Sequence, residues 1–358
     1  MPAATKLVST VDLPVIDLRP FLERADSPEA KAECLKLADA IKTYSAFAIR
    51  DPRVSEQENS DFLDLIEDYF NQPTEVKMKD VKPELSYQVG ATPSHTELPR
   101  CGRDDDCLEM VEKMAPEDRP LDFNETDPKW RYFWRMGDTP KETKFAQLNA
   151  DPVIPEAFPD WSNQMNHWGD RMLNAVNVTA TMLAIGLGLP ADTFTNLAHG
   201  GPHLLAPTAT DLSLYGKTDT VIAGFHSDLN FLTIHGKSRY PGLHIWTREG
   251  QKLLVKIPNG CLLVQAAKQI EFLTGGAIVA GFHEVCVVDS TLTAIERQKA
   301  LGRPTWRISS TLFYHLASDN ILEPLDAFKT EENVKKYPRQ YVGEQVQREL
   351  GFLELDKN

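Results

Sequence analysis

The segment GFHSDLNFLTIH, residues 224–235, sets a histidine and an aspartate between two short apolar runs. His226 and Asp228 stand two residues apart at the start of a predicted strand, where side chains at i and i+2 point to the same face. An imidazole and a carboxylate on one face can share one metal ion. Because a His-x-Asp pair also arises by chance in many sequences, its meaning depends on the residues around it.

Short apolar runs separated by Gly, Pro and Asn surround this segment from about residue 203 to residue 318. Many short strands at near-regular spacing predict an antiparallel sandwich or barrel. The runs expected as strands are 221–225, 231–235, 243–246, 253–257, 261–265, 270–273, 277–280, 284–288 and 307–315.

The rest of the chain predicts helices packed around this β core, an α+β, mainly β, class of fold. Apolar residues at three- and four-residue steps indicate helices over 28–45, 55–71 and 164–187, and short strands are expected at 13–18 and 46–49. Residues 95–163 have weak periodicity and are expected to form an irregular or helical insertion. The predicted regions, in one compact unit, are 1–120, 121–202 (insertion and long support helix), 203–318 (β core) and 319–358 (helical tail).

His283 heads the apolar run 284–288 and is the candidate for a third metal ligand, delivered from a distant strand. Two histidines and one carboxylate leave coordination positions open, which suits an Fe(II) that binds O2 and a co-substrate together. Arg307 and Ser309 share a face of a later apolar strand, where a guanidinium is costly unless it meets an anion. Together, Arg307 and Ser309 are predicted to bind a carboxylate through charge-assisted hydrogen bonds. For Arg307 taken alone, a structural salt bridge is the alternative.

Composition narrows the classes of partner. The 358 residues include 38 basic and 52 acidic ones, a formal net charge of -14, which argues against binding nucleic acid or an anionic membrane through a broad basic face. No apolar run approaches the roughly 18 to 20 residues of a membrane span, and the first residues lack a secretory core, so we expect a soluble, cytoplasmic protein. The five cysteines are expected as free thiols, with a Cys101–Cys107 clip as the alternative.

The order His-x-Asp, then His, then Arg-x-Ser is more specific than any of its parts. With it, the sequence resembles the isopenicillin N synthase-like branch of the Fe(II)/2-oxoglutarate-dependent dioxygenases over most of its length. The resemblance implies a double-stranded β-helix (jelly roll) core flanked by helices, with iron at its open end. The matching segments are Leu13-Pro14-Val15-Ile16-Asp17-Leu18, Tyr69-Phe70 with Pro73, Glu75 and Lys77, Gly186-Leu187-Gly188-Leu189, Pro241-Gly242-Leu243, and Arg307-Ile308-Ser309 with Phe313.

The resemblance also implies roles for individual residues. His226, Asp228 and His283 would be the iron ligands and the catalytic centre. Arg307 and Ser309 would hold the far carboxylate of 2-oxoglutarate, so Fe(II) and 2-oxoglutarate are the expected cofactors, with ascorbate as a candidate reductant. The partners expected are O2 and a small-molecule substrate, whose identity the sequence does not indicate, and the oligomeric state is equally open.

Candidates for substrate contact are less specific. Tyr87 resembles a family tyrosine near the pocket, and Phe225 and Phe313 are candidate walls of the pocket, with core packing as the alternative for all three. His235 and His244 lie within apolar runs and are expected to be packed or hydrogen-bonded rather than metal ligands.

The chain departs from the family pattern at three places. The family's Asn-Tyr-Tyr-Pro, whose second tyrosine bonds 2-oxoglutarate, reads LLAP at 204–207. Its Asn-x-Gly-Asp turn reads QAAK at 265–268, which puts Lys268 where an acid is usual. A helix-like stretch, 292–301, lengthens the connection between His283 and Arg307. None of these changes removes a predicted iron ligand.

Four functions remain open at this level. The leading one is a 2-oxoglutarate-dependent hydroxylase or desaturase of a small organic molecule that releases succinate and CO2. An Fe(II) oxidase that does not use 2-oxoglutarate, with Arg307 and Ser309 holding the substrate's own carboxylate, is the first alternative. A non-catalytic jelly-roll binding protein is the second, and a Zn(II) or Mn(II) hydrolase or isomerase is the third.

Overall fold

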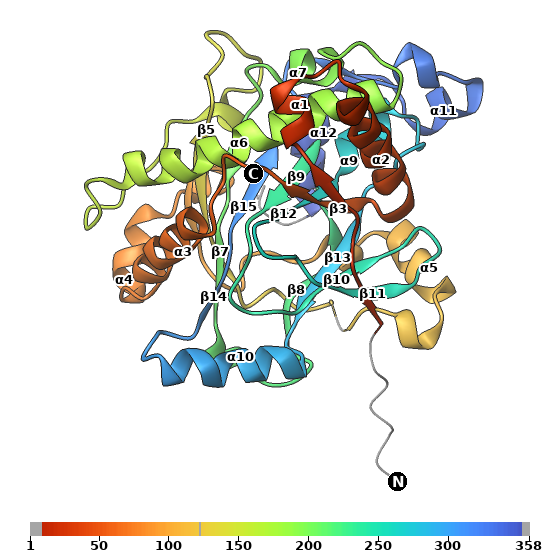
Figure 1. Cartoon of the computed structure of the whole chain (residues 1–358). Coiled ribbons are helices and arrows are strands. Elements are labelled where there is room, and N and C mark those ends of the chain that lie inside the picture. The colour runs from red at the N-terminus through yellow and green to blue at the C-terminus, as the bar shows by residue number, and fades with distance from the viewer. Residues whose placement is uncertain (1–8, 122, 353–358) are drawn as a thin grey trace.

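The computed structural model describes residues 9–121 and 123–352, and Figure 1 shows two β-sheets at its centre with helices around them. Within the described ranges, the smaller sheet has the strand order β1-β11-β10-β13-β8, and the larger has β14-β7-β5-β6-β15-β9-β12-β3-β2, with β4 added beside β5. Neighbouring strands are antiparallel except in the pairs β1–β11 and β2–β3. This arrangement is the predicted jelly-roll core flanked by helices.

The strands are short, because Gly, Pro and Asn interrupt the apolar runs of the sequence. Their bounds are β1 Thr10–Val11, β2 Val15–Asp17, β3 Ala46–Arg50, β4 Gly90–Thr92, β5 Trp130–Met136, β6 His203–Leu205, β7 Thr208–Asp211, β8 Val221–Ser227, β9 Leu232–His235, β10 Leu243–Trp246, β11 Lys252–Val255, β12 Leu262–Ala266, β13 Phe282–Cys286, β14 Trp306–Ser309, β15 Thr311–Tyr314, β16 Ile321–Leu322 and β17 Gln340–Tyr341.

The helices lie between and after these strands in the chain. Their bounds are α1 Arg19–Glu23, α2 Pro28–Tyr44, α3 Glu56–Phe70, α4 Thr74–Lys77, α5 Asp105–Lys113, α6 Trp161–Gly186, α7 Thr193–Ala198, α8 Leu212–Tyr215, α9 Lys268–Leu273, α10 Asp289–Ala300, α11 Glu331–Lys336 and α12 Val342–Phe352. The predictions of α2, α3, α6 and the inserted helix α10 are therefore confirmed, with small shifts of their ends.

Local capping explains where two of these helices begin. The Ser55 hydroxyl accepts a hydrogen bond from the Glu58 backbone N–H, and the Glu58 carboxylate accepts one from the Ser55 N–H, which together form a capping box at the start of α3. The Ser27 hydroxyl accepts from the Ala30 N–H at the start of α2, where Pro28 takes the first helical position.

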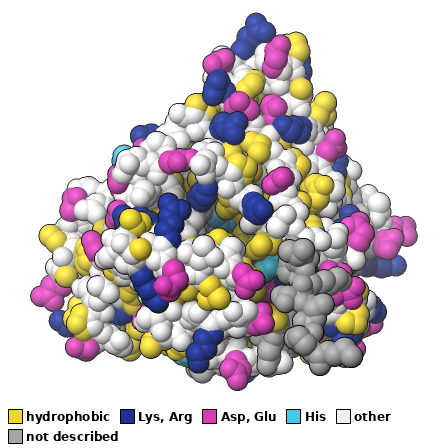
Figure 2. Space-filling model, turned by 60° about the horizontal axis from the view of Figure 1, so that its bottom comes forward, with side chains coloured by type: hydrophobic (Ala, Val, Ile, Leu, Met, Phe, Trp, Pro, Cys, Tyr) yellow, Lys and Arg dark blue, Asp and Glu magenta, His cyan; other side chains and the backbone are white. Residues whose placement is uncertain are grey.

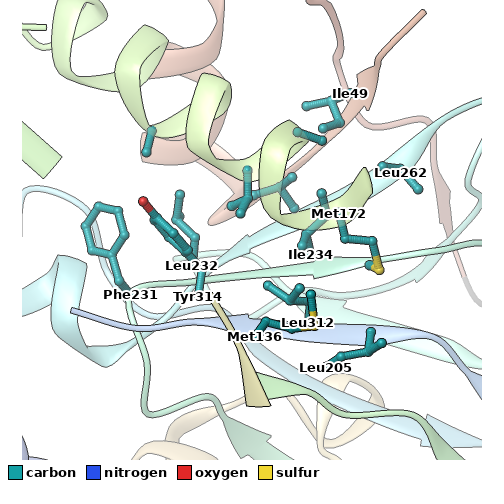
Figure 3. Close-up of a cluster of buried hydrophobic side chains, with 14 of the residues drawn as sticks. Ile49, Met136, Met172, Leu205, Phe231, Leu232, Ile234, Leu262, Leu312 and Tyr314 are labelled. Atoms are coloured by element: carbon teal, nitrogen blue, oxygen red, sulfur yellow. The ribbon is translucent and has the colours of Figure 1, made fainter. Parts of the chain in front are cut away.

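The main hydrophobic core lies between the larger sheet and helix α6 (Figure 3). Met172 of α6 points toward the larger sheet, whose strands β9, β12 and β15 contribute Ile234, Leu262 and Leu312 to the same cluster. All four are buried, so this helix seals one face of the sheet and leaves the space between the two sheets for the site.

Four predictions about elements are corrected by the structure. Residues 270–273 belong to helix α9, and 277–280 form no strand, because an apolar run this short fits either element and tertiary packing decides. The run 307–315 is divided into β14 and β15. Region 95–163 contains β5, a strand of the larger sheet that is buried along its whole length and therefore lacks the polar–apolar alternation of a half-exposed strand.

Candidate metal centre and its cavity

Strand pairing brings the predicted metal ligands together. His226 near the end of β8 is the direct cross-strand partner of His283 in β13, and Asp228 follows β8 by one residue. One ligand atom from each of the three lies within 4.8 Å of the other two. Nε2 of His226 and Nε2 of His283 are 3.7 and 3.9 Å from Oδ1 of Asp228, so the three side chains, here called the metal trio, converge on one point.

Backbone carbonyls orient the two imidazole rings of the metal trio. Nδ1 of His226 donates to the Gly224 carbonyl at 2.6 Å, and Nδ1 of His283 donates to the Gly281 carbonyl at 3.4 Å. A proton on Nδ1 leaves the Nε2 lone pair of each neutral ring free for a metal ion. The carboxylate is held as well, because the Thr233 hydroxyl donates to Oδ2 of Asp228 at 2.6 Å.

Burial sets the protonation states that a metal ion requires. It lowers the pKa of His283 to about 4 and also lowers the pKa of His226. Burial would raise the pKa of Asp228, but His283 and His226 beside it outweigh that effect and lower it. At neutral pH the metal trio therefore offers two neutral imidazoles and one carboxylate, the forms that bind a divalent cation.

The metal trio lines a cavity of about 510 Å³, whose opening is the hollow in Figure 2, with basic side chains around it and histidine atoms inside. One end of this cavity carries Arg307, Ser309 and Thr311 from β14 and β15, together with His235 from β9. We call this the arginine end.

Arg307 is the most unusual side chain at the arginine end. It is 5 % exposed, and its Nε has no hydrogen-bond partner among the described residues. Burial lowers its pKa to about 10, and within the described ranges no carboxylate forms an ion pair with it. The salt bridge considered as the alternative for Arg307 is therefore absent from this part of the chain. A buried, unpaired guanidinium is costly unless an anion completes it.

A second group of charges lines the cavity at what we call the ionic end. Glu97 and Asp127 flank Lys129, whose Nζ lies 3.0 Å from Oε2 of Glu97 and also contacts Asp127, and Arg131 contacts Glu97. Asp127 in turn accepts the Gly224 N–H at 2.8 Å, two residues before a histidine of the metal trio. No sequence pattern indicated this group, because it lies in the segment without periodicity.

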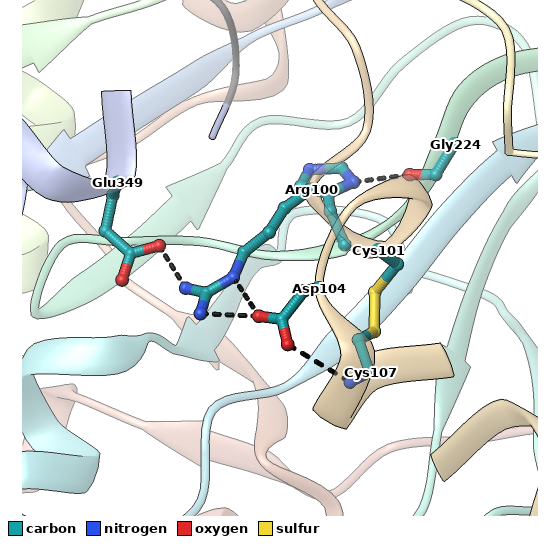
Figure 4. Close-up of a disulfide and its surroundings, with 7 residues drawn as sticks. Arg100, Cys101, Asp104, Cys107, Gly224 and Glu349 are labelled. Carbon is teal, nitrogen blue, oxygen red and sulfur yellow. Dashed lines mark hydrogen bonds and ion pairs between the residues drawn. A yellow bond between two sulfur atoms is a disulfide. The ribbon is translucent and has the colours of Figure 1, made fainter. Parts of the chain in front are cut away.

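The C-terminal helix α12 reaches the cavity next to the ionic end. Glu349 of α12 forms an ion pair with Arg100, and Arg100 also pairs with Asp104 at 2.6 Å (Figure 4). The Asp104 carboxylate caps α5 by accepting the Cys107 N–H. This turn places Cys107 beside Cys101, the residue that follows Arg100.

Cys101 and Cys107 are joined there by a disulfide, with their Cα atoms 5.2 Å apart. The prediction that all five cysteines are free thiols is therefore wrong for this pair. The tight turn into α5 places two residues six positions apart within bonding reach, which sequence spacing alone does not reveal. Cys34, Cys261 and Cys286 are free, as predicted, and all three are buried.

A second cluster of possible ligands lies on the other face of β10 and β13. His244, Glu284 and Cys286 also have ligand atoms within 4.8 Å of one another. Here, however, one Glu284 oxygen is ion-paired with Lys252 and the other accepts the Leu121 N–H at 3.1 Å. The carboxylate is already neutralised and hydrogen-bonded, so this cluster fits a divalent cation less well than the metal trio does.

The remaining predicted site residues are placed as follows. Phe313 lines the cavity, whereas Tyr87 packs near Phe145 and the buried Phe225 packs against Phe282 and Trp246, so neither of the two belongs to its lining. The alternative of core packing therefore describes Tyr87 and Phe225.

Lys268, for which the sequence offered no explanation, starts helix α9. Its backbone N–H donates to the Asp228 carbonyl at 2.9 Å, and its ammonium lies 3.6 Å from Glu271. His235 and His244 are hydrogen-bonded within the fold, as expected.

Two family models match the chain. The non-haem dioxygenase N-terminal model (described as "in morphine synthesis") matches residues 13–157, and the 2OG-Fe(II) oxygenase superfamily model matches residues 206–316, which contain the metal trio and the arginine end. The chain belongs to the Fe(II)/2-oxoglutarate-dependent oxygenase superfamily. Fe(II) and 2-oxoglutarate are the cofactors of this family.

Individual relatives of this oxygenase are distant. Kihadalactone A synthase LFS of Citrus sinensis is 26 % identical over 56 % of this chain, and the match spans 58 % of its own length. A 2-oxoglutarate-dependent dioxygenase of Gibberella zeae is 24 % identical over 76 % of this chain and 68 % of its own. The crystal structure of a 2OG-Fe(II) oxygenase family protein from Caulobacter crescentus has a TM-score of 0.72 at 22 % identity, covering 96 % of this chain and 99 % of that one, and supports the fold. Among the described residues of this chain, no helix is long and apolar enough to cross a membrane.

Proposed function

We propose that this chain is an Fe(II)- and 2-oxoglutarate-dependent oxygenase in which His226, Asp228 and His283 hold the iron. Arg307 and Ser309 hold the far carboxylate of 2-oxoglutarate, and a small organic substrate occupies the rest of the cavity. The substrate is hydroxylated or desaturated, while one O2 is consumed and 2-oxoglutarate is converted to succinate and CO2.

The observation that carries this proposal is the buried Arg307. O2 is the oxidant, Fe(II) would activate it when bound, and 2-oxoglutarate would supply two of the four electrons, while the protein supplies position and a dry chamber. The Arg307 guanidinium, unpaired within the described ranges, shares a cavity with the metal trio. A dicarboxylate that chelates a metal ion at the trio with one end would bring its other carboxylate to the guanidinium and satisfy the buried charge.

The donor set supports iron in particular. Two imidazoles and one carboxylate form the facial set that is typical of non-haem Fe(II) oxygenases, with open positions on the cavity side. Hydrogen bonds from the Thr233 hydroxyl and to the carbonyls of Gly224 and Gly281 orient all three ligands.

The proposal is tested by anaerobic titration of the Fe(II)-loaded protein with 2-oxoglutarate, followed by O2 and a succinate assay. We expect a charge-transfer absorption band on binding and slow succinate release after O2 is admitted. Arg307→Met should weaken 2-oxoglutarate binding by about 100-fold, because it removes a charge-assisted, bidentate partner. Arg297→Met, which removes an exposed arginine from α10, is the matched control.

Two results would contradict the proposal at different points. Failure of the wild-type protein to bind Fe(II), or binding that survives Asp228→Ala unchanged, would contradict the metal assignment. Iron binding without any response to 2-oxoglutarate would instead support an oxidase that uses the same metal site without this co-substrate.

A further inference from the structure

A chain of hydrogen bonds runs through the arginine end of the cavity. Oε1 of Gln265 lies 2.8 Å from Nε2 of His235, and Nδ1 of His235 lies 3.0 Å from the Thr311 hydroxyl. The Thr311 hydroxyl is 3.2 Å from the Ser309 hydroxyl, the group proposed to contact 2-oxoglutarate. Four polar side chains from strands β12, β9, β15 and β14 thus form one continuous path.

Strand pairing holds this path in place. His235 is the direct cross-strand partner of Thr311, and Thr311 follows Ser309 by two residues. The side chains are largely withdrawn from water: His235 is 9 %, Thr311 5 % and Gln265 1 % exposed. Polar groups in such an interior are costly unless each is hydrogen-bonded, so a path this long needs a reason.

The sequence suggests what the path replaces. In the related family a tyrosine of the Asn-Tyr-Tyr-Pro segment bonds 2-oxoglutarate, and the corresponding residue here is Ala206. Leu204, two residues earlier, lines the cavity and is also apolar. The arginine end of this chain must therefore obtain its polar contacts from other strands, and His235 and Thr311 line it.

The direction of the protons along the path decides what Ser309 can do. A serine hydroxyl carries one hydrogen, so Ser309 can donate to a carboxylate only if it accepts from Thr311. Thr311 must then accept from Nδ1–H of His235, and the lone pair on Nε2 must accept from Gln265. A neutral histidine ring has one donor and one acceptor, as this order requires.

Gln265 can complete that order. Its amide nitrogen is buried and has no hydrogen-bond partner among the described residues in the present orientation. The two ends of an amide are nearly the same shape, so a rotation of the group by half a turn brings its N–H to Nε2 of His235. The whole path then points its hydrogens toward the cavity.

We propose that His235 is a positioning residue for the co-substrate, which acts through Thr311 to turn the Ser309 hydroxyl toward the far carboxylate of 2-oxoglutarate. This inference rests on the proposed function and adds to it the residues that set the direction of one hydrogen bond. His235 itself is neither a metal ligand nor a contact to the reacting atoms.

The test compares two 2-oxo acids that bind a metal ion through the same group. 2-Oxoglutarate has a far carboxylate and 2-oxobutyrate does not. Their dissociation constants are measured anaerobically on Fe(II)-loaded protein by the charge-transfer band, without turnover. His235→Leu and Thr311→Val should each raise the dissociation constant of 2-oxoglutarate about tenfold, because the Ser309 hydroxyl is no longer held in the direction that donates to the far carboxylate. The dissociation constant of 2-oxobutyrate should change less than about twofold, because this acid has no far carboxylate to accept the hydrogen bond.

Controls separate a positioning role from simple loss of structure. Thr311→Ser keeps the hydroxyl and should bind 2-oxoglutarate like the wild type. In a Ser309→Ala background, His235→Leu should have no further effect, because the group that it positions is gone. This second comparison needs only 2-oxoglutarate and stands even if 2-oxobutyrate binds weakly.

The inference would be overturned if His235→Leu weakened the binding of both acids equally. It would also be overturned if the effects of His235→Leu and Ser309→Ala on 2-oxoglutarate binding were additive. Either result would indicate a structural role for His235. Failure of the wild-type protein to bind 2-oxoglutarate would be a different result, since it contradicts the proposed function itself and is seen before any variant is compared.

Discussion

Replacing Glu349 by Gln removes the charge that ties helix α12 to the segment around Arg100. Glu349 is 7 % exposed, and breaking a buried ion pair by removing one partner costs about 3–5 kcal/mol. Arg100 keeps its ion pair with Asp104 at 2.6 Å, and its side chain is 21 % exposed. Asp104 and water therefore compensate for part of the lost stabilisation. We therefore expect α12 to be destabilised locally by about 2 kcal/mol.

Amide hydrogen exchange measures this change directly. A loss of about 2 kcal/mol in local stability raises the exchange rate of the α12 amides about 30-fold, while the strands of the larger sheet keep their protection. Glu331→Gln removes an equivalent charge from α11, where the carboxylate is exposed, and serves as the control. A change in α12 no larger than that of the control would refute the idea that this ion pair holds the helix over the cavity.

Three further predictions concern other parts of the molecule. Burial would raise the pKa of Glu58, but hydrogen bonds from Ser55 and Arg171 outweigh it and lower this pKa to about 2. The ionised Glu58 therefore stabilises the folded protein above pH 4.5, and this contribution is lost as the pH falls toward 2. Glu58→Gln should cost about 1 kcal/mol at pH 7, and the difference from the wild type should vanish near pH 2 in denaturant titrations. Gly242→Ala should lower unfolding free energy by about 2–4 kcal/mol in thermal melts, since φ is +129° and a Cβ would lie 2.1 Å from the Cys286 carbonyl oxygen. Thr233→Val should weaken metal binding about 10- to 100-fold in chelator competition, because Asp228 loses its hydrogen bond.

Matched variants give each of these predictions a control. Glu56→Gln changes an exposed acid in the same helical turn and should show little dependence on pH in the acid range. Gly188→Ala adds a Cβ at positive φ into open space, so a loss as large as that of Gly242→Ala would argue against the clash. Thr233→Ser keeps the hydroxyl, and metal affinity reduced as much as in the valine variant would point to packing instead.

The metal trio was predictable only in part. The two-residue spacing of His226 and Asp228 defines a shared face in a strand without any knowledge of the fold. The placement of His283 opposite His226 depends on which strands pair, and the sequence indicated it only through the order of motifs and the family resemblance. Pairing across the 57 positions that separate these residues is a property of the folded chain.

Other features left no readable pattern. Strand β5, which carries Arg131, is buried throughout and so lacks alternation, and the ionic end that it helps to build was missed for that reason. The helix α9 was expected as a strand at 270–273, because the four residues Ile-Glu-Phe-Leu are too few to distinguish a period of 2 from one of 3.6. The hydrogen-bond path through His235 was hidden for a similar reason, since a histidine in an apolar run has many possible partners.

The two ends of the cavity are built from different parts of the chain. The metal trio and the arginine end lie within residues 226–311, whereas Glu97, Lys129 and Glu349 come from outside that span. We therefore expect a mutational library confined to 97–131 and 342–352 to leave iron loading intact. Asp127 should be excluded from such a library, because its carboxylate holds the Gly224 N–H in the strand that carries the first ligand.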